Sequence, residues 1–133
     1  MLHNFKKIKD FLPVIIKDED YDFASILNLL RFKLNRMHCH FTSWDCPLDP
    51  SEARRIAKQI KYAIYLIDRY YDESGFEELA DTLTWDKYEI LPLRTPEESK
   101  RIVEFMEKDS KLKQEYLDRL FRHMAKYIQT WWD

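Results

Sequence analysis

Apolar residues recur at helical spacing near the N-terminus, with lysines between them. The first apolar residues stand three or four positions apart, at Leu2, Phe5, Ile8 and Leu12. This spacing predicts a short amphipathic helix, and Pro13 is expected to end it. The segment that follows, "PVIIKDED" at residues 13–20, starts with β-branched residues and predicts extended chain or a short edge strand, with the strand candidate at 13–16. Residues 86–93 ("DKYEILPL") alternate weakly, so the two segments are candidates for a minor two-stranded ribbon.

Two longer stretches predict long helices. The first begins at Asp20 or Asp22, and its apolar stripe consists of Phe23, Ile26, Leu27, Leu30, Leu34, Met37 and Phe41. The second begins at "DPSE", where Asp49 is the expected N-cap, Pro50 occupies the first turn and Glu52 completes a capping box. Its stripe consists of Ile56, Ile60, Ala63, Ile64, Ile67 and Tyr71. Gly75 is the predicted C-terminal stop.

The C-terminal part of the chain predicts one short and one long helix. "FEELADTLTW" favours the short helix, and "TPEE", residues 95–98, repeats the capping pattern that begins the long one. No proline or glycine marks residues 108–111, so a continuous helix and a bent one both remain open. The apolar stripe of this helix consists of Leu117, Leu120, Phe121, Met124 and Ile128, and the same spacing continues to Trp131 and Trp132.

Composition supports a helical fold with one core. Only one glycine accompanies five prolines, which argues against a hairpin-rich β structure. With 133 residues, 45% hydrophobic and 15% aromatic, the chain has enough apolar material for a single core. The prediction is an all-α single domain spanning 1–133, an antiparallel bundle of three long helices with one or two short ones.

Charge and cysteine content limit the cellular location and the classes of binding partner that we expect for this protein. A net charge of −2 provides no overall attraction to nucleic acid. The longest uncharged run is eight residues, so nothing is expected to span a membrane, and no membrane partner is predicted. Cys39 and Cys46 occur without a signal peptide, which favours reduced thiols and a cytoplasmic protein.

Few residues are arranged for catalysis or metal binding. A single glycine excludes a phosphate-binding loop and a dinucleotide fingerprint. His38, His40 and Cys46 are the best metal candidates, but His38 and His40 diverge by about 200° if the helix continues through them. We therefore predict no cofactor and no catalytic residue. The simpler interpretation of this segment is a helix C-terminus, where histidine interacts favourably with the helix dipole.

Basic residues with interspersed tyrosines form a candidate ligand face on the second long helix. Arg54, Lys58, Lys61 and Tyr65 follow at i, i+4, i+7 and i+11, with Tyr62 and Arg69 adjacent. A similar basic stripe on the last helix consists of Arg119, Arg122 and Lys126. A nucleotide or short nucleic acid is the ligand that such faces suit. The simpler interpretation is a solvated helix face.

Two tryptophans close the chain and admit two interpretations. In the first, they hold the C-terminal segment on the core, with an indole N–H that donates to a polar partner. In the second, they are anchors for another protein, because tryptophan is favoured at binding hot spots. The full set of candidate anchors is Trp44, Trp85, Trp131, Trp132, Tyr70 and Tyr71.

Three segments resemble a family of small bacteriophage-encoded proteins without an established activity. They are "DYDFASILNLLRFKLNRM", "IKYAIYLIDRYYD" and the terminal "LDRLFRHMAKYIQTWWD". The resemblance implies a phage product in the cytoplasm of a bacterial host. We therefore predict a non-enzymatic module that binds a host or phage protein, with homo-oligomerisation also compatible. The alternative is a nucleotide-binding or nucleic-acid-binding protein, and a metal-dependent nucleotide hydrolase ranks third.

Overall fold

The described part of the chain is helical, which confirms the predicted all-α class. The structure is a computed structural model and describes residues 2–17, 22–83 and 95–131. Helices and the turns between them account for these ranges, and they contain no strand. The predicted two-stranded ribbon is wrong at its first strand, because residues 13–16 are helical. Its second strand, over 86–93, lies outside the described residues.

The chain divides into two compact units, which are described here one at a time. Unit 1 contains residues 1–64 together with 130–133, and unit 2 contains residues 65–129. The single domain over 1–133 stays a prediction. Helix α3 (Pro50–Tyr70) contributes its first fifteen residues to unit 1 and its last turns to unit 2.

Unit 1 begins with α1 (Leu2–Ile16), which continues through Pro13. The predicted stop at Pro13 is therefore wrong. Proline removes the backbone N–H that would bond one turn back, but the turn that follows it is still closed, because Lys17 N donates to the Pro13 carbonyl at 3.3 Å. Val14 is half-buried and lies against α2, so tertiary contact favours continuing the helix.

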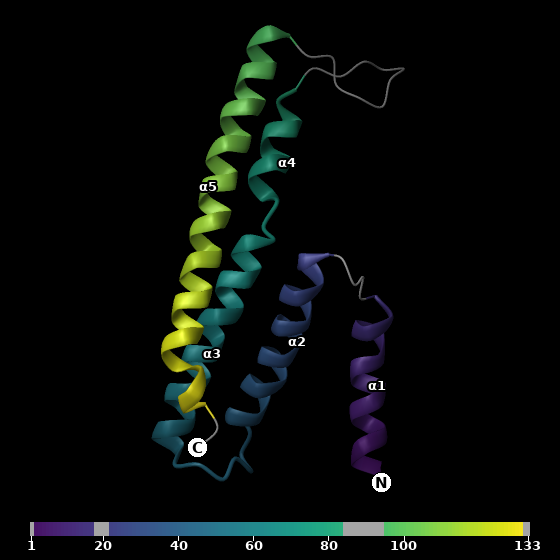
Figure 1. Ribbon diagram of the computed structural model, residues 1–133, viewed down its shortest axis with the longest axis vertical. Coiled ribbons are helices and arrows are strands. Elements are labelled where there is room, and N and C mark those ends of the chain that lie inside the picture. The colour runs from purple at the N-terminus through teal and green to yellow at the C-terminus, as the bar shows by residue number, and fades with distance from the viewer. Residues whose placement is uncertain (1, 18–21, 84–94, 132–133) are drawn as a thin grey trace. The chain divides into compact units, whose positions relative to one another are not determined.

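Helix α2 (Phe23–Phe41) lies beside α1 in the opposite direction (Figure 1). The phenyl rings of Phe11 and Phe32 meet edge to face with centroids 4.8 Å apart. The Arg36 guanidinium forms an ion pair of 2.7 Å with Asp10. The later residue of α1, Phe11, contacts the earlier residue of α2, Phe32, so the two helices are antiparallel. Asp22, one of the two predicted starting points, is the N-cap of α2 and accepts a hydrogen bond from Ala24 N at 3.0 Å.

The core of unit 1 is formed by α2, α3 and Trp131. Helix α2 supplies Leu27, Leu34 and Phe41, and α3 supplies Ala53, Ile56, Ala57, Ile60 and Ala63. These positions confirm the two predicted stripes over most of their length. The exception is the start of α2, where Phe23 and Ile26 are mostly exposed. At the start of α3, Ser51 N donates to the Asp49 carboxylate at 3.0 Å, as expected of an N-cap.

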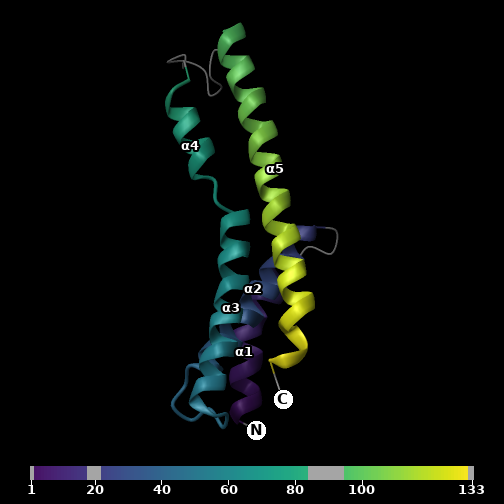
Figure 2. The ribbon, with the colours of Figure 1, turned by 90° about the vertical axis from the view of Figure 1, so that its left-hand side faces the viewer.

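Unit 2 pairs the end of α3 and α4 (Ser74–Asp81) with α5 (Pro96–Tyr127). Arg69 bonds to Tyr116, Glu73 pairs with Lys113 at 3.0 Å, and Thr82 accepts from Arg101 at 2.8 Å. Later residues of the α3–α4 segment contact earlier residues of α5, so the arrangement is again antiparallel. Helix α4 lies beside the first half of α5 (Figure 2). Leu66, Ile67, Ile102, Leu120 and Met124 form the buried core of this unit.

Helix α5 runs without interruption, which decides the question that the sequence left open. Thr95 is its N-cap, and its hydroxyl oxygen accepts from Glu98 N at 3.2 Å. The helix continues through residues 108–111, where Lys113 pairs with Asp109 one turn earlier at 3.3 Å. It is followed by one 3-10 turn, η1 (Ile128–Thr130).

Gly75 does not end a helix, so that prediction is wrong. Helix α3 ends at Tyr70, and Gly75 lies in the first turn of α4. Its φ is not positive, so no left-handed conformation requires glycine here. A Cβ at this position would lie 3.2 Å from a ring carbon of Phe105. Glycine therefore allows α4 to approach the Phe105 ring closely.

Candidate binding surfaces in unit 1

A row of large apolar side chains is exposed along α1. It consists of Phe5, Ile8, Leu12, Ile15 and Ile16, which are 66%, 61%, 48%, 62% and 71% exposed. We call this set the α1 row. Phe5, Ile8 and Leu12 follow one another at three and four residues, and Ile15 and Ile16 follow Leu12 by three and four, so all five share one face of the helix. Phe5, Ile8 and Leu12 belong to the predicted apolar stripe of this helix, whereas Ile15 and Ile16 lie in the segment that was predicted to be extended. The fourth member of the predicted stripe is Leu2, whose side chain lies outside the described residues.

The opposite face of α1 makes the contact with α2. Asp10, Phe11 and Val14 are its half-buried members, and Val14 follows Asp10 by four residues and Phe11 by three. Helix α1 is therefore apolar on both sides. The pattern identified the helix correctly but not the face that packs. Both the α1 row and the face with Phe11 and Val14 are apolar, and it is the second face that lies against α2.

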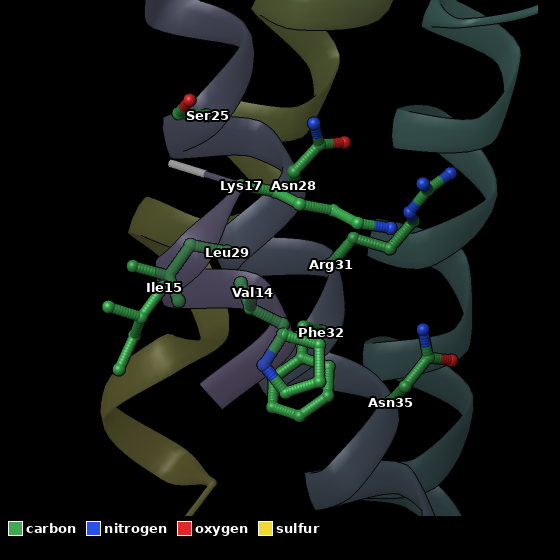
Figure 3. A pocket seen from close by; sticks show the side chains of 10 residues that line it. Val14, Ile15, Lys17, Ser25, Asn28, Leu29, Arg31, Phe32 and Asn35 are labelled. Carbon is green, nitrogen blue, oxygen red and sulfur yellow. The ribbon is translucent and has the colours of Figure 1, made fainter. Parts of the chain in front are cut away.

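A pocket of about 400 Å³ lies where the C-terminal end of α1 meets α2. Ile15 of the α1 row and Leu29 of α2 lie on one side of it, and Lys17 and Arg31 extend towards the other (Figure 3). The α1 row thus ends in a hollow with an apolar side and a basic side.

A larger pocket of about 710 Å³ lies between α1, α2 and the turn that follows α2. Its basic lining residues are Lys7, Lys33, Arg36 and His40, and its apolar ones are Phe11, Met37, Phe41, Pro47, Leu48 and Trp131. We call it the basic pocket. Lys33, Arg36 and His40 stand at i, i+3 and i+7 on α2, and Lys7 and Phe11 stand at i and i+4 on α1. Each helix therefore presents one side to the same cavity.

Arg36 differs from the other cations of the basic pocket, because its charge is already compensated. It pairs with Asp10, and its guanidinium carbon lies 5.2 Å from the ring centroid of Phe11. Among the described residues, no acidic side chain forms an ion pair with Lys7 or Lys33. Within the described ranges, the pocket therefore combines an apolar wall with two ammonium groups that form no ion pair with a carboxylate.

The sequence did not identify the basic pocket. Its basic residues lie outside the stripes and faces that the sequence pattern singled out. The spacing of Lys33, Arg36 and His40 is the same kind of signal that identified the basic stripe on α3. It was missed because it flanks the apolar stripe, and only the packing of α1 beside it closes a cavity.

The two described tryptophans have opposite environments. Trp131 has no exposed surface, and its Nε1–H donates to Gln59 Oε1 at 2.9 Å. This is the intramolecular arrangement that the sequence offered as its first interpretation. Trp131 is withdrawn as a partner-binding anchor, because a fully buried side chain presents no surface to a partner. Trp44, in contrast, is 97% exposed in the turn after α2. Trp85 and Trp132 lie outside the described residues.

The tyrosine candidates belong to unit 2 and are half-buried. The rings of Tyr70 and Tyr71 contact each other edge to face, with centroids 5.3 Å apart. Arg69 donates from Nε and Nη2 to the Tyr116 hydroxyl at 3.4 and 3.3 Å. This hydrogen bond raises the pKa of Arg69. Arg69 is thus engaged within unit 2.

The predicted basic faces are largely exposed. On α3 the unit 1 members Arg54, Lys58, Lys61 and Tyr62 are exposed, and so is Tyr65 at the start of unit 2. On α5 the exposed members are Arg119, Arg122 and Lys126. The pKa of Asp49, next to this end of α3, is lowered because Ser51 donates hydrogen bonds to its carboxylate. This arrangement fits both the ligand face and the solvated helix face.

The structure does not bring the metal candidates together. His38 and His40 both lie within α2, where residues two apart point in directions that differ by about 200°. Cys46 follows in the turn after α2 and is a free thiol. Within the described ranges, no three or more His, Cys, Asp or Glu side chains are grouped closely enough to hold a metal ion.

Two general findings complete the description of these surfaces. Of the helices that the structure describes, none is long and apolar enough to cross a bilayer. Comparison of the chain with known protein families, with curated proteins and with solved structures finds no match.

Proposed function

We propose that this chain is a non-enzymatic binding protein and that the α1 row contacts a protein partner. The observation that carries the proposal is the exposure of five large apolar side chains in one continuous row. Exposed apolar rows of this extent on a helix are typical of interaction surfaces. The row lies on the face of α1 opposite to the contact with α2, so a partner could cover it without displacing that contact.

The charges around the α1 row support a partner with an apolar groove and an acidic rim. Lys6, Lys9 and Lys17 are exposed beside the row, whereas the single acid of α1, Asp10, is paired with Arg36. Amphipathic helices bind in such grooves through residues spaced three and four apart. A second copy of the chain fits less well, because two α1 faces would bring their lysines together.

The resemblance to small phage-encoded proteins provides a context for this proposal. A product of that kind, made in a bacterial cytoplasm, would act on a protein of the host or of the phage. Binding through an exposed helix face requires neither a cofactor nor a catalytic group. The proposal therefore needs nothing beyond the surface that α1 carries.

The test compares two aspartate substitutions at exposed apolar positions. Ile8→Asp places a charge within the α1 row, and Phe121→Asp places one on an exposed part of α5, where the wild-type ring is 55% exposed. Tagged wild-type and variant chains are used to capture proteins from a bacterial lysate. We expect a protein that is retained by the wild type and by Phe121→Asp but lost with Ile8→Asp. Retention by all three chains, or equal loss with both variants, would contradict the proposal.

A second candidate function is the binding of a nucleotide or short nucleic acid along α3. It is favoured by the exposure of Arg54, Lys58 and Lys61 with Tyr62 on one helix. Cations would meet phosphates while a tyrosine stacks on a base. Such binding should weaken steeply as the salt concentration rises, because it releases counterions. Affinity for a single-stranded oligonucleotide that does not change with salt would count against this function.

A further inference from the structure

The basic pocket has the features of a small-molecule site, and these are independent of the α1 row. Its volume of about 710 Å³ is in the range typical of cofactor and ligand pockets. Its α1 wall is formed by Lys7 and Phe11, on the side of the helix that faces α2. Phe41 and Trp131 are buried, so the apolar wall is fixed by the core of unit 1.

The charge of the pocket selects for a dianion. Two lysines and one arginine, Lys7, Lys33 and Arg36, line it, and the Asp10 carboxylate compensates Arg36 at 2.7 Å. Counting only the described residues, two positive charges remain, on the exposed ammonium groups of Lys7 and Lys33. A phosphate monoester carries a charge of about −1.5 to −2 at neutral pH. It would therefore neutralise the pocket, whereas a carboxylate would leave about one charge unmatched.

The apolar part of the pocket selects for the body of the ligand. Aromatic and aliphatic side chains, Phe11, Met37, Phe41, Leu48 and Trp131, form most of the remaining wall. Flat apolar groups bind well against such walls, through area burial and ring contacts. A bare phosphate ion would use the two lysines only and would leave this wall in contact with water.

We propose that the basic pocket binds a small phosphate monoester with a planar, apolar body. Nucleoside monophosphates and phosphorylated phenols share this chemistry. Lys7 and Lys33 would hold the phosphate from the two helices, and the planar group would lie against the half-buried part of the wall, which contains Phe11 and Met37. Binding at this pocket goes beyond the contact of the α1 row with a protein partner and does not depend on it.

The experiment is a calorimetric titration with four probes at low salt. Adenosine 5′-monophosphate and phenyl phosphate represent the two sources of the shared chemistry, adenosine lacks the charge, and inorganic phosphate lacks the body. We expect one or both monoesters to bind at least tenfold more tightly than adenosine and inorganic phosphate. Whichever monoester binds more tightly identifies the source. Failure of both monoesters at millimolar concentration, or equal binding of adenosine, would overturn the proposal.

Matched lysine variants locate the site. Lys7→Gln and Lys33→Gln each remove one pocket cation, and Lys9→Gln removes an exposed lysine of α1 that does not line the pocket. Each pocket variant should weaken binding of the better monoester by about tenfold, the usual effect of one charge-assisted hydrogen bond. Lys9→Gln should change it less than about twofold. Unchanged affinity in both pocket variants, or an equal loss with Lys9→Gln, would place the ligand elsewhere and overturn the assignment.

A nuclear magnetic resonance experiment provides an independent readout. The Trp131 indole N–H is held by Gln59, and the ring lines the pocket, so its signal reports on occupancy. The expected result is a saturable shift of this signal during titration with the monoester, absent with adenosine. A heat of binding that leaves the Trp131 signal unchanged would contradict binding in the basic pocket.

Discussion

Replacement of Trp131 by alanine tests the packing of unit 1 most severely. The side chain has no exposed surface, and a tryptophan buries about 150–250 Å² on folding. At about 25 cal/mol per Å², this burial corresponds to about 4–6 kcal/mol as an upper estimate. Loss of the Nε1–H bond to Gln59 adds little, because the half-exposed amide can bond to water instead. We expect Trp131→Ala to lower the free energy of unfolding by about 3–5 kcal/mol.

The assay is urea unfolding followed by far-ultraviolet circular dichroism, which does not depend on tryptophan emission. The matched control is Trp44→Ala, which removes the same side chain from a position that is 97% exposed. It should change the free energy of unfolding by less than about 0.5 kcal/mol. If Trp131→Ala and Trp44→Ala were equally mild, Trp131 would not occupy the core, and the reasoning would be refuted.

Three further predictions concern other contacts. Asp72→Asn removes a carboxylate that accepts a hydrogen bond from Ser74 N at 3.0 Å. This bond lowers the pKa of Asp72. The stability that it contributes is therefore present above about pH 4 and is lost as the pH falls towards the folded-state pKa. Unfolding curves should therefore separate wild type and variant at pH 6 and approach each other as the pH falls below about 4, and a constant gap would contradict this. The Arg36–Asp10 pair is about one-third exposed, so water screens its charges. A double-mutant cycle should give a coupling energy of only about 0.5 kcal/mol, which weakens as the salt concentration rises. A coupling energy above about 2 kcal/mol would contradict this, because it would require a pair that is less screened. Ser110→Pro interrupts α5 and should lower the free energy of unfolding by about 3 kcal/mol or more, whereas Ser110→Ala should leave it nearly unchanged. A proline variant as mild as the alanine variant would mean that α5 is already broken at this position.

The sequence predicted the long helices well because their signals agree. In α3, the Asp49 cap, Pro50 in the first turn and the buried spacing from Ile56 to Ile67 all indicate the same helix. Trp131 was reached in the same way, by extending the stripe of the last helix, and its hydrogen bond follows from the need of a buried indole for an acceptor. Local pattern and tertiary packing coincide at these residues.

The remaining features depend on contacts that the pattern does not contain. Pro13 does not end α1, and the predicted apolar stripe of that helix is exposed, because Phe11 and Val14 contact α2 instead. Gly75 is explained by the nearby Phe105 ring, which is thirty residues later in the chain. The basic pocket requires Lys7 and Lys33 from two different helices, so no local motif reveals it.

Site-specific photocrosslinking from the α1 row tests the proposed binding function most directly. A photoreactive amino acid replaces Leu12 in the row or, as a control, Phe121 on α5, and the chain is irradiated in bacterial cells. We predict a discrete crosslinked protein from position 12 but not from position 121. Excess wild-type chain should suppress this product, and excess Ile8→Asp chain should not. Equal crosslinking from both positions, or equal suppression by both competitors, would contradict the assignment of the α1 row as the partner-binding surface.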